Sequence, residues 1–121
     1  MSNDIDWDSI RELARRIDES EPLILTSEVR ALLLRTAHEV GIPREEAEAA
    51  ALGVATATTR LRETRRRIRE GAQRLMRAIT GVRRLREAGD VAGARKLFED
   101  VLAVEVVPLY REQAELGLEV V

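Results

Sequence analysis

The sequence lacks most of the residue types that build chemical sites. It has no cysteine and a single histidine, His38, in 121 residues. Without cysteine, disulfides and thiolate metal sites are excluded. One histidine cannot supply the two Glu-x-x-His motifs of a di-metal carboxylate bundle, and a hydrolytic triad needs a histidine placed between an acid and a nucleophile. We therefore predict no catalytic residue, no cofactor and no metal site, in a protein that is not an enzyme.

Aromatic residues and long apolar runs are also scarce. The aromatic residues make up 2% of the chain and are Trp7, Phe98 and Tyr110. The core must therefore consist of aliphatic side chains, which suits helix-on-helix packing. No apolar run approaches the roughly 20 residues of a membrane helix, so no membrane partner is expected. Three aspartates among the first eight residues are the wrong charge for a secretory signal, and we expect a cytoplasmic protein.

What the chain does contain is a strongly basic segment, residues 60–86. This segment carries eleven of the 20 basic residues and only two acids, Glu63 and Glu70. The rest of the chain holds the other 20 of the 22 acids. With 45% apolar and 35% charged residues, the chain is expected to fold as one globular domain over residues 1–121.

The spacing of apolar residues predicts an all-α bundle of four to six helices around the basic segment. The predicted helices cover roughly residues 4–20, 27–40, 43–88, 91–106 and 108–119. Gly41 and Gly89 are expected to end the second and third helices, and Pro108 to separate the last two. Thr26 and Asp90 are expected to cap the helices that follow them.

The predicted helix over residues 43–88 is long for a small domain. An apolar residue recurs at every seventh position, a coiled-coil-like spacing: Ala47, Val54, Leu61, Ile68, Leu75 and Val82. As one rod the helix would be about 69 Å long, whereas a compact domain of this size is about 30–40 Å across. We therefore expect a break near residues 53–59, where glycine and threonine are poor helix formers. The alternative is an elongated molecule, held by a partner.

An inner line of apolar residues is predicted for the basic part of this helix. It consists of Leu61, Ile68, Ala72, Leu75, Ile79 and Val82. The candidate charged interaction face consists of Arg65, Arg66, Arg69, Arg77 and Arg84, which point away from that line or flank it.

This arginine face allows two functional hypotheses. We favour a non-catalytic protein-interaction or scaffolding module that self-associates, with an unidentified protein partner. The alternative is non-specific nucleic-acid binding by the 60–86 helix, because arginines neutralise phosphates. Against the alternative, no aromatic residue interleaves to stack on bases, and the sequence pI is an acidic 5.6. If most of these arginines project into solvent on one open face, nucleic-acid binding becomes the leading hypothesis. If they lie against the acids of the first or last helix, the nucleic-acid hypothesis is dropped.

Six short segments spread over nearly the whole chain form a pattern. They are Asp6-Trp7, Glu21-Pro-Leu, Leu25-Thr-Ser-Glu-Val-Arg-Ala-Leu-Leu, Arg65-Arg-Arg-Ile-Arg-Glu-Gly, Arg86-Glu-Ala-Gly-Asp and Val104-Glu-Val-Val-Pro-Leu-Tyr-Arg. This pattern resembles the DUSAM-domain proteins, small and repeatedly duplicated bacterial domains without an assigned activity. The resemblance implies a stand-alone module with paralogues. It implies no chemistry, because none of the segments is a catalytic motif.

Overall fold

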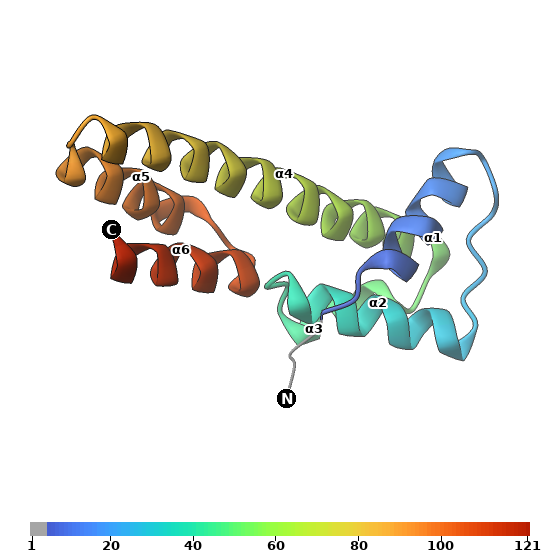
Figure 1. The fold of residues 1–121 in the computed structure, drawn as a ribbon. Coiled ribbons are helices and arrows are strands. Elements are labelled where there is room, and N and C mark those ends of the chain that lie inside the picture. Colours follow the sequence, from blue (N-terminus) through green and yellow to red (C-terminus); the bar gives the residue numbers. More distant parts are fainter. Residues whose placement is uncertain (1–4) are drawn as a thin grey trace. The chain divides into compact units, whose positions relative to one another are not determined.

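The computed structural model describes residues 5–121, and all regular structure within them is α-helical. The six helices are α1 (Asp8–Asp18), α2 (Ser27–Glu39), α3 (Arg44–Ala50), α4 (Val54–Glu87), α5 (Val91–Val104) and α6 (Pro108–Val120), labelled in Figure 1. The predicted all-α fold is therefore confirmed. By their internal contacts the residues group into two compact units, one ending at Arg66 and one spanning Arg67–Val121. Helix α4 begins in the first unit and ends in the second, and the single domain stays a prediction.

In the first unit, α1 begins later than predicted. The expected start at residue 4 lies outside the described residues, and the helix begins at Asp8. Asp6 precedes the helix, and its carboxylate accepts a hydrogen bond of 2.9 Å from the backbone N–H of Asp8. An aspartate that binds the amide two residues ahead forms a turn of its own, so it delays the helix. From there α1 buries Ile10 and Leu13 against the rest of the unit.

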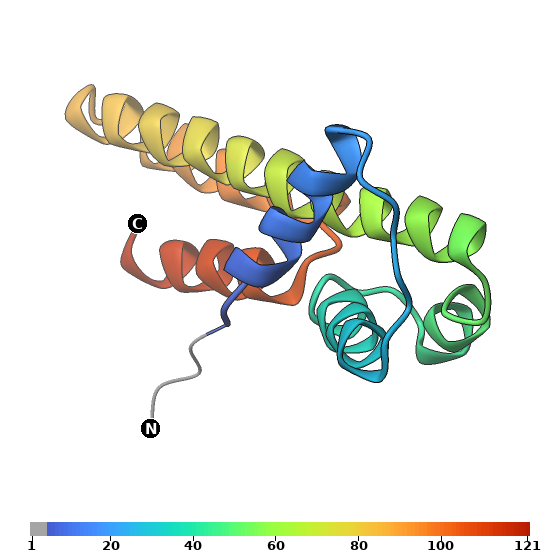
Figure 2. The same cartoon turned by 90° about the vertical axis from the view of Figure 1, so that its right-hand side faces the viewer.

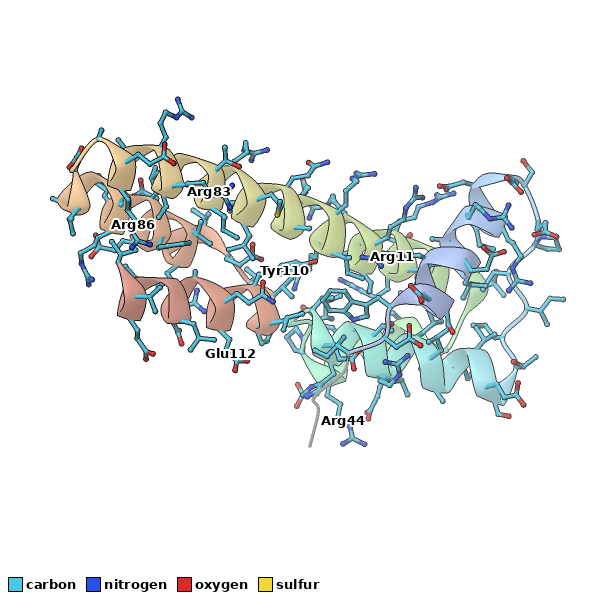
Figure 3. The ribbon with its side chains drawn as sticks, in the orientation of Figure 1. Arg11, Arg44, Arg83, Arg86, Tyr110 and Glu112 are labelled. Atoms are coloured by element: carbon cyan, nitrogen blue, oxygen red, sulfur yellow. The ribbon has the colours of Figure 1, made fainter. Side chains whose placement is uncertain are left out.

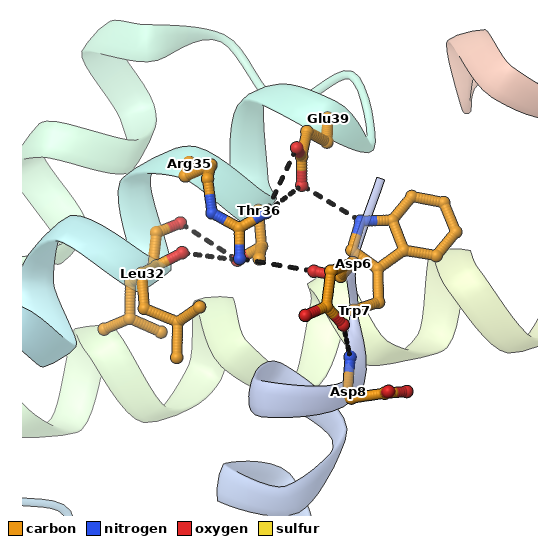
Figure 4. Close-up of polar contacts among 8 residues, drawn as sticks. Asp6, Trp7, Asp8, Leu32, Arg35, Thr36 and Glu39 are labelled. Carbon is orange, nitrogen blue, oxygen red and sulfur yellow. Dashed lines mark hydrogen bonds and ion pairs between the residues drawn. The ribbon is translucent and has the colours of Figure 1, made fainter. Parts of the chain in front are cut away.

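A polar cluster fixes the entry to α1 (Figure 4). The buried Trp7 donates from Nε1 to Glu39 at 3.1 Å, and Glu39 also accepts from Arg35 at 3.0 Å. Arg35 in turn donates to the carbonyl of Asp6 at 3.2 Å. The indole ring is therefore held by its polar edge as well as by its apolar faces. This cluster ties α1 to α2.

The predicted end and start signals of α2 are confirmed. The Thr26 hydroxyl accepts from the backbone N–H of Val29 at 3.1 Å, as an N-cap does. Gly41 follows the helix with φ 82°, the left-handed conformation that glycine adopts without strain.

The predicted break in the third helix is also confirmed, at the near edge of the expected range. Helix α3 ends at Ala50 and α4 begins at Val54. The Thr56 hydroxyl donates to the carbonyl of Ala50 at 2.7 Å and to that of Gly53 at 3.0 Å, so it bridges the turn. The threonines themselves are helical, and the hydroxyls of Thr58 and Thr59 donate to carbonyls of the preceding turn. Val54 is exposed, unlike the other positions of the seven-residue repeat, since it starts a new helix.

In the second unit, α5 runs antiparallel to the end of α4, and α6 runs antiparallel to α5 (Figures 1 and 2). Gly89 has φ 79°, and the Asp90 carboxylate caps α5 by accepting from the N–H of Gly93 at 2.8 Å. Pro108 is the first residue of α6, as predicted for a residue that ends one helix and starts another. The buried apolar residues here include Ile68, Leu75, Ala78, Val82, Ala94, Phe98, Val101, Val107, Tyr110 and Ala114. The predicted inner line is buried at Leu61, Ile68, Leu75 and Val82 and half-buried at Ala72 and Ile79.

Candidate functional site

The structure divides the five arginines of the predicted interaction face into two groups. Arg65 is half-buried and forms an ion pair with Asp18 at the end of α1. Arg66 is exposed but hydrogen-bonds to Glu63, one turn earlier on its own helix, at 2.6–2.9 Å. Both therefore have an acidic partner in the first unit.

The other three residues, Arg69, Arg77 and Arg84, form what we call the arginine ridge. All three are exposed, and none of them has an acidic partner among residues 5–121. Spacings of eight and seven residues are close to two helical turns, so the three side chains leave α4 on one side. The buried Leu75 and Val82 lie on the opposite side of the same helix. The arginine ridge lies wholly in the second unit.

An exposed methionine accompanies the ridge. Met76 is 61% exposed, and its place next to Arg77 puts it at the edge of the same helix face. An unbranched thioether side chain adapts to the shape of a partner, so it suits a binding surface. The face therefore offers three cations and an apolar contact.

Only a few acids from other segments form ion pairs with arginines of residues 60–86. Outside the ridge, Arg60 lies 3.9 Å from Glu46. On α1, Arg15 pairs with Glu12 at 2.5 Å and with Glu19, just after the helix, at 2.7 Å, whereas Asp18 pairs with Arg65 of α4. The Arg15 hydrogen bond lowers the pKa of Glu12 below its usual value. These ion pairs leave the ridge unpaired.

The most deeply buried charge of the second unit is a residue that the sequence did not single out. The Glu105 side chain is 1% exposed and accepts from Arg74 of α4 at 2.7 Å. Its other oxygen accepts the backbone N–H groups of Val106 and Val107, each at 3.0 Å. Glu105 therefore joins α4 to the turn between α5 and α6. The available signal was a lone acid among valines just before Pro108.

A second unpaired charged surface lies on α6. Glu112, Glu115 and Glu119 are exposed, and none of them has a basic partner in the described part of the chain; we call them the acidic stripe. Figure 3 shows Glu112 on the side of α6 that points away from α4. Leu116, 54% exposed, lies among them. Spacings of three and four residues put all three acids on one helix face, and that signal was present in the sequence.

Two further arginines of α4 face a different feature. A hollow of about 470 Å³ between α4, α5 and α6 has apolar walls that include Val82, Phe98 and Gly117, with Arg83 and Arg86 at its edge. Figure 3 labels both arginines. They flank the buried side of α4, so they do not belong to the arginine ridge.

His38, the single histidine, is exposed on α2. Within residues 5–121, no three His, Asp or Glu side chains gather as a metal ion would require. Nor does any helix in that range combine the length and the apolar character needed to cross a membrane.

A comparison with protein families gives one match over almost the whole chain. A family model with the description "Protein of unknown function (DUF2379)" matches residues 5–121. The chain belongs to this family. No curated protein and no solved structure matches it. The description of DUF2379 assigns no activity to the family.

Proposed function

We propose that this DUF2379 chain is a non-catalytic protein-interaction module that self-associates, and that the arginine ridge is the surface it uses. The observation behind the proposal is the unpaired state of Arg69, Arg77 and Arg84 on a helix whose other face is buried. Exposed arginines beside an apolar contact such as Met76 are typical of protein interfaces, where arginine and methionine are enriched. Helix α4 can therefore pack against the core with its apolar face and bind a partner with its cationic outer face.

Nucleic-acid binding through the same ridge is the second candidate. The specific observation in its favour is that three of the five candidate arginines are open to solvent on one face. The ridge alone offers three cations, but Arg62, Arg83 and Arg86 of the same helix are exposed too, so the segment reaches the lower end of the roughly 6–10 contacts of a typical duplex-binding protein. Trp7, Phe98 and Tyr110 are all buried, so no aromatic ring is available for a base to stack on. The burial of all three aromatic rings favours a protein partner.

The remaining parts of the hypothesis rest on sequence alone. An absence of catalytic and cofactor-binding residues and a cytoplasmic location stay predictions. The resemblance to DUSAM-domain proteins also stays a prediction, because the matched family model carries a different description.

Sedimentation velocity of the purified chain tests the proposal. Between about 1 and 300 µM we expect the average mass to rise above the 13.6 kDa of one chain, and to fall again when salt is raised. A 13.6 kDa species at every concentration would contradict self-association.

A mobility-shift experiment separates the second candidate from the first. At low salt, duplex DNA and single-stranded RNA are each titrated with the wild-type chain and with Arg69→Gln/Arg77→Gln/Arg84→Gln. We expect no shift at micromolar protein. A shift that the triple variant loses, and that salt removes steeply, would make nucleic acid the partner of the ridge.

A further inference from the structure

The second unit carries two surfaces of opposite charge, and neither is neutralised. The arginine ridge of α4 offers three cations, and the acidic stripe of α6 offers three anions. Each of the six side chains is exposed and lacks an oppositely charged partner within residues 5–121. Two such surfaces on one small unit need an explanation beyond solubility, for which mixed charges serve better than separate ones.

The two surfaces cannot meet within one chain. On α6, Tyr110 and Ala114 face the core, and the acidic stripe lies on the other side of the helix. On α4, Leu75 and Val82 face the core, and the ridge lies on the other side. Both charged surfaces therefore point outward, and a partner from outside the chain is required to join them.

The spacing of the charges matches. Arg77 and Arg84 are seven residues apart on α4, and Glu112 and Glu119 are seven residues apart on α6. Seven residues of helix span about 10.5 Å in both cases. Two helices laid side by side can therefore place both arginines opposite both glutamates.

The apolar residues match as well. Met76 is 61% exposed beside the ridge, and Leu116 is 54% exposed within the acidic stripe. An isolated exposed ion pair contributes little to binding, so charges alone would give a weak contact. An apolar contact flanked by opposite charges is the usual composition of an interface, with an apolar centre and a polar rim.

We propose that the arginine ridge of one chain binds the acidic stripe of a second copy of the same chain. This inference rests on the proposed self-association and names the two surfaces that make it. Because the surfaces differ, the contact is head-to-tail: it adds further copies unless the arrangement closes on itself. Its strength falls as salt screens the charges.

Charge reversal on each surface tests the inference. The ridge variant carries Arg69→Glu/Arg77→Glu/Arg84→Glu, and the stripe variant carries Glu112→Lys/Glu115→Lys/Glu119→Lys. In the ridge variant both surfaces are negative, and in the stripe variant both are positive. We expect each variant alone to self-associate at least tenfold more weakly than the wild-type chain in sedimentation velocity. An equimolar mixture restores both pairings, so we expect it to regain association to within about threefold of the wild type.

A matched control separates the ridge from net charge. Arg11→Glu/Arg16→Glu/Arg44→Glu alters the net charge by the same amount as the ridge variant, at three exposed positions of the first unit that lie outside α4. We expect this control to associate as the wild type does. Circular dichroism checks that every variant keeps its helix content, and the mixture remains informative because misfolded chains would not recover.

The possible results distinguish the inference from the proposed function. If the wild type associates and both charge-reversed variants associate equally well, the surfaces are wrong while self-association stands. If the variants are weakened but their mixture does not recover, the two surfaces do not pair with each other, and the inference is overturned. If the wild type is monomeric throughout, self-association and the inference fail together.

Discussion

At the scale of single residues, Leu75 is the clearest test of how α4 is oriented. It is 4% exposed, on the predicted inner line, and replacing a buried leucine with alanine removes apolar contacts and leaves a cavity. We expect Leu75→Ala to lower the free energy of unfolding by about 2–5 kcal/mol in urea. Leu52→Ala is the control, since Leu52 is 84% exposed, and it should cost about 0.5 kcal/mol or less. A loss of that small size at Leu75 would put the residue on the surface.

Gly71 is a position inside α4 where packing requires a residue without a side chain. Glycine is a weak helix former, yet Gly71 lies within an unbroken helix. A β-carbon built there would overlap the ring of Tyr110, whose hydroxyl donates to the carbonyl of Ile68 at 2.9 Å. The glycine thus allows α6 to approach α4 closely, and this need exceeds the propensity cost of about 1 kcal/mol.

We therefore predict that Gly71→Ala destabilises the protein although alanine is the better helix former. The expected loss is about 1–3 kcal/mol, as for overpacking of a core. In a Tyr110→Ala background the ring is absent, so the same substitution should become neutral or stabilising. A double-mutant cycle by urea unfolding measures this coupling. Equal effects in both backgrounds would show that the ring is not the reason for the glycine.

At the scale of helices, the contact between α4 and the turn before α6 depends on Glu105. Its carboxylate accepts from Arg74 and from two backbone amides, so truncation leaves several buried donors without a partner. We expect Glu105→Ala to cost about 3–5 kcal/mol in thermal or urea unfolding.

The matched control is an exposed ion pair in the same unit. Lys96 and Asp100 are 3.0 Å apart on α5 with side chains 72% and 59% exposed, so Lys96→Ala should cost about 0.5 kcal/mol or less. Similar losses for the two variants would contradict a structural role for Glu105.

Features that depend on local contacts could be predicted from the sequence, and features that depend on contacts between distant residues could not. Helix ends were predictable because the residues that mark them contact only neighbours within one turn. These residues are Thr26, Gly41, Gly89, Asp90 and Pro108. The contact of Asp6 is local as well, but the spacing of apolar residues did not show that its carboxylate would form a turn before α1. The pairings of Arg65 with Asp18 and of Arg74 with Glu105 join residues 47 and 31 positions apart. No local pattern specifies such partners.

The candidate site was predicted in part for that reason. Helical spacing placed Arg69, Arg77 and Arg84 on the outer face, which needed only the register of α4. Which arginines of that face keep their charge depended on acids contributed by other segments. The spacing of the acidic stripe was equally clear in the sequence. That the stripe faces outward followed only from the structure, in which α6 buries its opposite face.

At the scale of the whole molecule, the shared helix α4 raises the question of whether the two units unfold together. Helix α4 contributes Leu61 to the first unit and Leu75 to the second. The expected single domain requires that losing one unit shortens this helix and so weakens the other. Trp7, the only tryptophan, lies in the first unit, so its fluorescence reports on that unit alone, whereas circular dichroism follows all the helices.

We predict one cooperative transition, with coincident urea midpoints for Trp7 fluorescence and far-ultraviolet circular dichroism. Leu75→Ala makes the test sharper, because it damages only the second unit. In a single cooperative domain, this variant shifts the Trp7 midpoint as far as the circular dichroism midpoint. If the units unfold independently, the Trp7 midpoint stays at its wild-type value while circular dichroism resolves an earlier second transition. In that case the chain would be two domains joined along α4, and the arginine ridge and acidic stripe would belong to the second of them.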